Sequence, residues 1–295
     1  MKYWLCGFIS IGLWAAEPAG EAAKKPAEAQ PYLRFEEKAK GAALEVGVIR
    51  MQHKETGALV DLVGAVHIGD AAYYQQLNKE FKTYEAVLYE MVKPAKLDPA
   101  QFKNRPSSSV SMMQIFMQKQ LDLAYQLDEV DYTAKNFVHA DMTMETFQER
   151  QKAKGQNLFS LIEKSIEAQE KAGSENKQQF DFASMFKLLN DEGGPNGMKL
   201  ALGRQFHDIE SMIGGMEGPD GSVLVAERNI TALKVMESEM KKGKKNLGIF
   251  YGAAHLPDFD KRLIEDYGFK RTTKTWNAAW KIQKAAAKKA LKDSI

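Results

Sequence analysis

The sequence predicts an α/β fold of the α+β type, with a mixed sheet built around a duplicated unit. Apolar runs rich in Val, Leu and Ile alternate with segments whose apolar residues have helical spacing. The stretches GAVHIGD (Gly64–Asp70) and GAAHLPD (Gly252–Asp258) share Gly, Ala, His and Asp and carry an aliphatic residue after the His. Each follows an apolar strand and precedes a helix, so we expect one strand–GxxH–helix–strand unit to occur twice. A large helical insertion at about 106–218 is expected to form a lid over this sheet.

Composition places the chain among ordinary globular proteins. Apolar residues make up 44% of the chain, which is enough for a buried core without disulfides or structural metals. The formal net charge is +2, from 41 basic and 39 acidic residues. Because nucleic-acid-binding proteins usually carry a marked basic excess, we expect no nucleic-acid partner.

The N-terminus has the pattern of a secretory signal peptide. Tyr3–Ala16 is apolar and uncharged but too short to cross a bilayer as a helix. We expect residues 1–19 to be a cleaved signal, with an uncleaved anchor as the alternative, and 20–31 to be a disordered tether. Residues 32–295 would form one domain without a stable membrane span. This predicts an exported protein: periplasmic, at the cell surface or secreted. Cys6 is the only cysteine, so the mature chain would have no disulfide or thiol nucleophile.

Before the insertion the pattern is mainly that of strands. Runs at 32–37, 42–53 and 58–69 predict an antiparallel meander, with Gly57 in the turn between the second and third runs. A helix is expected from Asp70 to Tyr84, followed by a short strand at 86–92. After the insertion we expect a helix at 222–242 that ends at Gly243, a strand at 245–255, a helix at 258–269 and a strand at 270–280.

The two motifs supply the central site candidates. Gly64 and Gly252 lie at strand ends, where glycine permits a turn and the close approach of another group. Residues at the carboxyl ends of strands project toward the ligand crevice of layered α/β proteins. Two such units packed about a pseudo-twofold axis would bring His67 and His255 face to face. Glu90 ends the strand after the first unit and is expected to face both histidines.

Two His and one Glu are a usable ligand set for a divalent transition metal with open positions for water. Without a metal, the same trio could act as a general base held by a carboxylate. Arg228 and Asn229, early in the helix at 222–242, are further candidates. Arg228 could bind a substrate carboxylate or an oxyanion, and the alternative is a surface pair with Glu227.

Other polar residues receive structural interpretations. We interpret Asp70 and Asp258 as helix N-caps, and Asp141 as the cap of the helix that follows it. His139 is a weaker site candidate. His53, in a predicted turn, and His207, in a helical region, are expected to lie at the surface.

The order of the motifs GAVH, YE, ERN and GAAH resembles the TraB/PrgY (TIKI, GumN-like) family over about residues 32–280. The resemblance implies an α/β domain with a duplicated core and, for some members, a metal-dependent peptidase. It implies that His67, Glu90 and His255 are the metal or catalytic groups, with Arg228 as a supporting catalytic cation, and Gly64, Gly252 and Asn229 around the cofactor.

A divalent metal is therefore expected. The resemblance suggests Mn or Co, and Zn suits the ligands equally well. The expected partner is a peptide or protein substrate. Two alternatives remain: a non-catalytic protein that sequesters a peptide or haem, and a metal-free esterase that uses His67 as the base.

Overall fold

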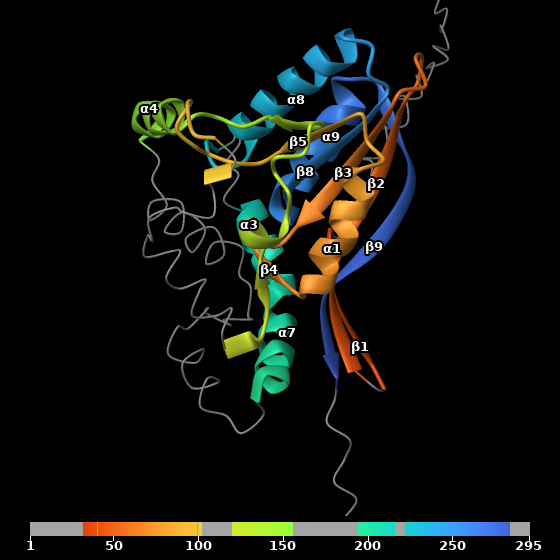
Figure 1. Cartoon of the computed structure of the whole chain (residues 1–295), viewed down its shortest axis with the longest axis vertical. Helices are drawn as coiled ribbons and strands as arrows, with labels where there is room; N and C mark the ends of the chain where they lie inside the picture. The colour runs from red at the N-terminus through yellow and green to blue at the C-terminus, as the bar shows by residue number, and fades with distance from the viewer. Residues whose placement is uncertain are drawn as a thin grey trace, which may run out of the picture. The chain divides into compact units, whose positions relative to one another are not determined.

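A mixed sheet forms the centre of the molecule, which confirms the predicted α/β (α+β) class (Figure 1). The computed structural model describes residues 32–39, 41–98, 100–101, 120–155, 194–215 and 222–283, and of 205–215 only the backbone. Within these residues the sheet has seven strands, and all of them belong to one compact unit, Pro31–Ile295.

The described strands are β1 (Leu33–Lys38), β2 (Gly41–His53), β3 (Leu59–Ala65), β4 (Ile68–Gly69), β5 (Ala86–Tyr89), β6 (Ala124–Tyr125), β7 (Phe137–His139), β8 (Asn246–Gly252) and β9 (Phe269–Gln283). The helices are α1 (Ala71–Phe81), α3 (Gln126–Glu129), α4 (Met144–Lys154), α7 (Gly194–Gly215), α8 (Ala226–Lys241) and α9 (Leu256–Glu265). A short 3₁₀ helix, Ala253–His255, joins β8 to α9.

The antiparallel part of the sheet is the predicted meander. β2 pairs with β9 along its whole length, and on its other side with β1 and then β3. Gly57 makes the turn between β2 and β3 with a φ of 70°, in the left-handed region that glycine adopts without strain. The predicted run at 58–69 divides into β3 and the short β4, which pairs with β6 in a separate small sheet.

The other part of the sheet is parallel and brings the two motifs together. β3, β8, β5 and β7 lie side by side in that order, all parallel. Gly64 pairs with Tyr251 and Ala65 with Gly252, so the motifs end adjacent strands and are offset by one residue. Beyond this point they diverge, because the first continues into a loop and β4 and the second into the 3₁₀ helix and α9.

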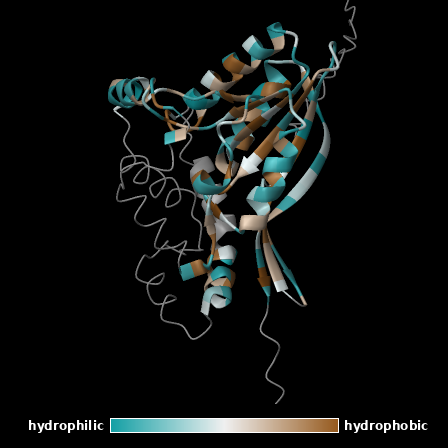
Figure 2. Cartoon of the chain, viewed as in Figure 1, coloured by the Kyte–Doolittle hydropathy of each residue, from teal (hydrophilic) through white to brown (hydrophobic). Residues whose placement is uncertain are grey.

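Helices cover both faces of the sheet, and two apolar cores result. One core contains Val63 and Phe250 and includes residues of α1 and α7. The other contains Leu62 and Ile249 and includes residues of α8 and α9. Because neighbouring residues of β3 and β8 are buried on opposite faces, these strands are largely apolar, with Asp61 as the buried exception in β3 (Figure 2).

The segment 106–218 was predicted to be a helical insertion, and this is only partly correct. Where the structure describes it, it contains α3, α4 and α7, but also β6 and β7. β7 pairs with β5 at the edge of the main sheet. Three residues are too few to show the alternation from which a strand is recognised. The remainder, at 106–119, 156–193 and 216–218, lies outside the described residues.

Of the three predicted aspartate caps, only Asp70 occupies an N-cap position, and its side chain makes no capping hydrogen bond. Asp70 precedes α1, but its side chain accepts from Lys199 Nζ at 3.2 Å and from the Lys281 amide at 2.7 Å. Asp258 lies inside α9 and accepts from Arg262 Nε at 2.8 Å. Thr143, not Asp141, caps α4. Asp70 and Asp141 instead bind segments that are distant in sequence, and Asp258 also accepts from Asn229 of α8. By contrast Gly243, with a φ of 95°, ends α8 as expected.

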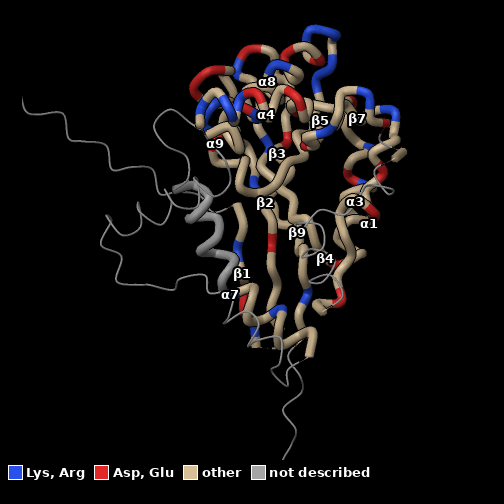
Figure 3. Tube along the Cα trace, turned by 90° about the vertical axis from the view of Figure 1, so that its left-hand side faces the viewer, with Lys and Arg blue, Asp and Glu red and all other residues tan. Residues whose placement is uncertain are grey.

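None of the described helices is long and apolar enough to cross a membrane. Acidic and basic residues are interspersed around α4, α8 and α9 in Figure 3, in keeping with the net charge of +2. The signal peptide and tether predicted at 1–31 lie outside the described residues.

Candidate functional site

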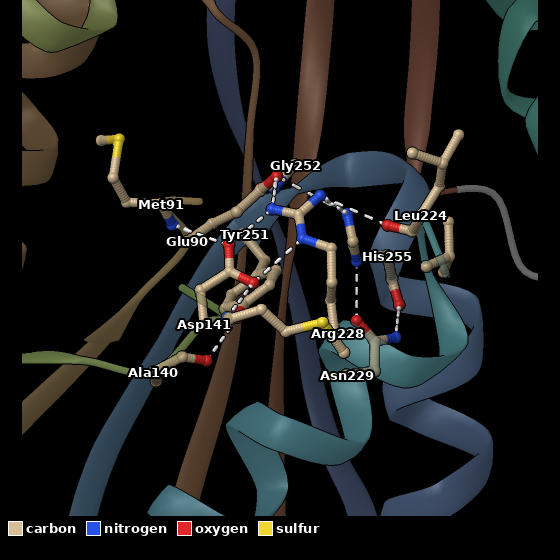
Figure 4. A network of polar contacts seen from close by, with 12 residues as sticks. Glu90, Met91, Ala140, Asp141, Leu224, Arg228, Asn229, Tyr251, Gly252 and His255 are labelled. Carbon is tan, nitrogen blue, oxygen red and sulfur yellow. Dashed lines mark hydrogen bonds and ion pairs between the residues drawn. The ribbon is translucent and has the colours of Figure 1, made fainter. Parts of the chain in front are cut away.

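A cluster of polar side chains lies at the carboxyl ends of the four parallel strands (Figure 4). Glu90 follows β5, Asp141 lies two residues after β7, and His255 follows β8 through the 3₁₀ helix. His67 lies two residues after β3. Arg228 enters the cluster from the first turn of α8. This edge of a parallel sheet is where α/β proteins bind ligands.

Arg228 is buried at the centre of the cluster. Its Nε donates to Asp141 Oδ1 at 3.0 Å, and its Nη2 donates to Asp141 Oδ2 at 2.6 Å and to Glu90 Oε1 at 2.7 Å. Its Nη1 lies 3.3 Å from the Leu224 carbonyl and 3.4 Å from His255 Nε2. All five N–H groups of the guanidinium are therefore directed at protein acceptors. The side chain is neither a surface partner of Glu227 nor free to bind a substrate anion as it stands.

Asp141 is a member of the cluster that the sequence reasoning missed, because it was interpreted as a helix cap. Its side chain is 0% exposed and accepts four hydrogen bonds: two from Arg228 and one each from the amides of Met91 and Met142. A signal was present in FVHAD, where an acid follows a short apolar run, as in AVLYE. These four bonds occupy the lone pairs of both carboxylate oxygens, so Asp141 orients Arg228 and the main chain at Met91 and Met142.

Glu90 keeps some contact with solvent and has spare acceptor capacity. Its Oε1 accepts from Arg228, and its Oε2 accepts from the Gly252 amide at 2.6 Å. Burial acts to raise the pKa of Glu90, but the charge of Arg228, then His255, His67 and the amide bond, outweighs it. The pKa is held well below its usual range, so Glu90 is ionised at neutral pH.

The neighbouring Asn229 fixes the tautomer of His255. The Asn229 Nδ2 donates to the His255 carbonyl at 3.0 Å and to Asp258 Oδ2 at 2.8 Å, and both of these atoms can only accept. The amide Oδ1 therefore faces His255 Nδ1, at 2.6 Å, and that nitrogen must carry the proton. Burial lowers the pKa of His255 to about 4, against the raising effect of Glu90, so the ring is neutral at neutral pH. The lone pair of Nε2 then faces Glu90 and Arg228.

His67 belongs to the same edge but differs from His255 in its surroundings. It is exposed, and its carbonyl accepts from the Gln126 amide at 2.9 Å. It follows β3, which ends at the same edge of the sheet as β8. The duplicated motif thus supplies one buried and one exposed histidine.

The two motif glycines have different roles. A Cβ on Gly64 would meet Val46 Cγ1 at 2.5 Å and the Gly47 carbonyl at 3.0 Å, so close packing within the sheet explains this glycine. A Cβ on Gly252 would meet Glu90 Oε2 at 3.3 Å. Of the two glycines predicted to surround a cofactor, Gly252 adjoins the polar cluster, whereas Gly64 packs against its sheet neighbours and Leu256.

Two of the three predicted metal ligands, His255 and Glu90, lie close together. The described residues contain no group of three or more His, Cys, Asp or Glu side chains placed to hold a metal ion. Of the predicted ligands, His255 Nε2 and Glu90 Oε1 face each other at 3.6 Å. Two donors on one tetrahedral ion, with bonds of about 2.1 Å, lie about 3.4 Å apart, so this pair fits a metal.

Two further observations support that fit. A carboxylate oxygen that accepts one hydrogen bond keeps a second lone pair, which leaves Oε1 able to bind an ion. With His255 neutral, Glu90 and Asp141 outweigh the charge of Arg228 by one negative unit, and such a buried excess favours a cation.

The other histidines lie outside this pair. His139 is half-buried, and its Nε2 lies 2.7 Å from the carbonyl of Met91, the residue after Glu90. The ring therefore contacts the main chain and not the Glu90 carboxylate. His53 is half-buried in the β2–β3 turn, at the opposite end of β3, where its Nδ1 accepts from the amides of Glu55 and Thr56. The side chain of His207 lies outside the described part.

No protein-family model matches this chain, and no curated protein is significantly similar to it. The resemblance to TraB/PrgY proteins therefore depends on the order of the short motifs alone.

Proposed function

We propose that this protein is an exported, metal-dependent hydrolase of the TraB/PrgY type that acts on a peptide or protein. The observation that carries the proposal is the buried pair of His255 Nε2 and Glu90 Oε1, 3.6 Å apart at the carboxyl edge of the sheet. The signal-like N-terminal sequence supports export, and the family resemblance supports a peptide substrate.

The protonation states of this pair favour metal binding over direct proton transfer. His255, with a pKa of about 4, and Glu90, with a pKa well below its usual range, are weak bases at neutral pH. A good general base has a pKa near the working pH. A metal ligand must instead be deprotonated, and both groups meet that condition.

The residues of the site divide into ligands and supports. His255 and Glu90 would hold a divalent ion, with His67 as the third donor. Such an ion acidifies a bound water and polarises the scissile carbonyl. Asn229 accepts a hydrogen bond from the proton on His255 Nδ1, so that Nε2 carries the lone pair with which a histidine binds a metal. Arg228 compensates the charges of Glu90 and Asp141 and orients Glu90.

Metal content and activity test this proposal together. We expect purified protein to bind about one divalent ion, to cleave members of a peptide library with Mn²⁺, Co²⁺ or Zn²⁺, and to lose activity in chelator. His255→Ala and Glu90→Gln should lower both metal affinity and cleavage. His53→Ala, at the opposite end of β3, is the control and should change neither.

Other outcomes separate the alternatives. Cleavage that survives chelator and is lost in His67→Ala would support the metal-free esterase. A Soret band on adding haem, or tight peptide binding without turnover, would support a sequestering protein. If the protein binds no divalent ion when the ion is supplied at millimolar concentration, the proposal of a metal-dependent hydrolase is refuted.

A further inference from the structure

Two side chains, one at the end of the edge strand β7 and one just after it, bind the main chain of the residue that follows Glu90. The Met91 amide donates to Asp141 Oδ2 at 2.9 Å. His139 Nε2 lies 2.7 Å from the Met91 carbonyl, and because a carbonyl only accepts, this nitrogen carries a proton and donates. The His-x-Asp sequence at the end of β7 therefore binds Met91 on both sides of its main chain.

Asp141 also reaches Glu90 by a second route. Its two oxygens bind Arg228 through Nε and Nη2, which fixes the plane of the guanidinium. The same Nη2 donates to Glu90 Oε1 at 2.7 Å. The backbone and the carboxylate of Glu90 thus both depend on one buried carboxylate.

We propose that Asp141 and His139 are positioning residues that set the Glu90 carboxylate against His255 and the Gly252 amide. The proposal rests on the proposed function for its effect on metal binding, but not for its effect on the Glu90 segment. Neither residue is assigned a contact with the substrate or the ion. The edge strand β7 is then part of the site and not only of a lid.

A second pair, in which a buried aspartate binds a partly exposed arginine, supplies a control. Asp61, within β3, accepts from Arg50 Nε and Nη2, both at 2.8 Å, and from the Tyr84 hydroxyl at 2.8 Å. Its side chain is 4% exposed, nearly as buried as that of Asp141. It has the same paired geometry but contacts none of the residues around Glu90. An effect of losing a buried Asp–Arg pair in general would appear equally in Asp61→Asn.

Asp141→Asn is a sharp perturbation because all four partners of Asp141 are donors. Oδ1 accepts from the Met142 amide and Arg228 Nε, and Oδ2 accepts from the Met91 amide and Arg228 Nη2. Whichever way the asparagine amide turns, its NH₂ faces two N–H groups. His139→Ala is the milder variant, and His139→Gln should restore the bond because its amide can donate to the Met91 carbonyl.

The experiment combines amide hydrogen exchange, metal titration and unfolding. We expect Asp141→Asn and His139→Ala to speed exchange at the Met91 and Gly252 amides. We expect them to weaken Mn²⁺ binding by about 10- to 100-fold, the usual cost of losing an outer-shell partner. His139→Gln should recover most of that loss. Asp61→Asn should lower unfolding stability while leaving metal affinity and both amides unchanged.

The outcomes are separable. Unchanged exchange at both amides in Asp141→Asn and His139→Ala would overturn the proposal, as would equal changes in Asp61→Asn. If Asp141→Asn does not fold, His139→Ala and its glutamine rescue decide the question. If wild-type protein binds no Mn²⁺, the proposed function fails, and the exchange measurements alone still test the positioning role.

Discussion

Asn229→Ala is the most informative single perturbation, because this side chain fixes the tautomer of His255. Asn229 is fully buried and makes three hydrogen bonds: to Asp258, to the His255 carbonyl and from His255 Nδ1. The alanine variant leaves all three partners without this group. It keeps the backbone of α8 and removes only the amide.

The expected cost follows from those bonds. A neutral hydrogen bond contributes about 1 kcal/mol and one to a charged group about 1.5–3 kcal/mol, so the three together contribute roughly 4 kcal/mol. Alanine is a better helix former than asparagine by about 0.6 kcal/mol, which offsets part of the loss. We therefore expect Asn229→Ala to lower the free energy of unfolding by about 3 to 4 kcal/mol, or the melting temperature by roughly 6 to 16 °C.

Two assays check this expectation on chelator-treated protein. Urea unfolding measures the free energy, and ¹⁵N NMR of the imidazole reports which nitrogen of His255 carries the proton. Wild type should show the proton on Nδ1, and Asn229→Ala should show a mixture of tautomers. Asn136→Ala removes two hydrogen bonds, to the carbonyls of Phe81 and Tyr84, and serves as the control. It should cost stability without changing the tautomer. A loss under about 1 kcal/mol in Asn229→Ala, or an unchanged tautomer, would refute the reasoning.

Three further predictions follow from the same geometry. The pKa of His255 falls from 6.5 to about 4 on folding, so the unfolded state binds more protons between these values and stability falls as pH drops through that window. The difference of 6.5 − 4 = 2.5 units corresponds to about 3 kcal/mol, and His255→Gln in chelator should lose this slope in unfolding experiments. Gly64→Ala forces a Cβ to 2.5 Å from Val46 Cγ1, so we expect a destabilisation of about 1–3 kcal/mol. A metal titration of this variant should give the wild-type affinity. A loss of affinity as large as that of a Glu90 variant would contradict the packing role. Arg228→Ala leaves two carboxylates without their cation, for an expected loss of about 3–5 kcal/mol in urea unfolding; a near-neutral effect would mean that the carboxylates are protonated or solvated.

Much of the fold could be predicted from local pattern. The runs at 42–53 and 58–69 were recognisable because they are long and largely apolar, although the second divides into β3 and β4, and Gly57 and Gly243 marked turns by their conformational freedom. β7 was not recognisable, since three residues carry no periodicity. Its place beside β5 comes from pairing across some 50 residues of chain, as in Val87 with Phe137.

The site was predicted in part for the same reason. His67, Glu90 and His255 stood out because each follows an apolar strand, and parallel strands end at a common edge. Asp141 looked like a helix cap because it precedes α4 by only a few residues, and the capping role fell to Thr143. An aspartate just before a helix can bind nearby backbone amides or a distant side chain, and the local sequence does not distinguish these partners. Arg228 is its partner because α8 packs beside the end of β7 in the folded protein.

The sequence by itself determined the long strands and helices and placed His67, Glu90 and His255 at strand ends, because these features depend on hydrophobic period and on neighbours in the chain. Only the tertiary structure decided that one motif histidine is buried and the other exposed, that Arg228 is fully engaged and that Asp141 joins it. Burial and hydrogen-bond partners are set by contacts between segments far apart in the chain, and these contacts fix the pKa of His255, its tautomer and the pairing of charges around Glu90.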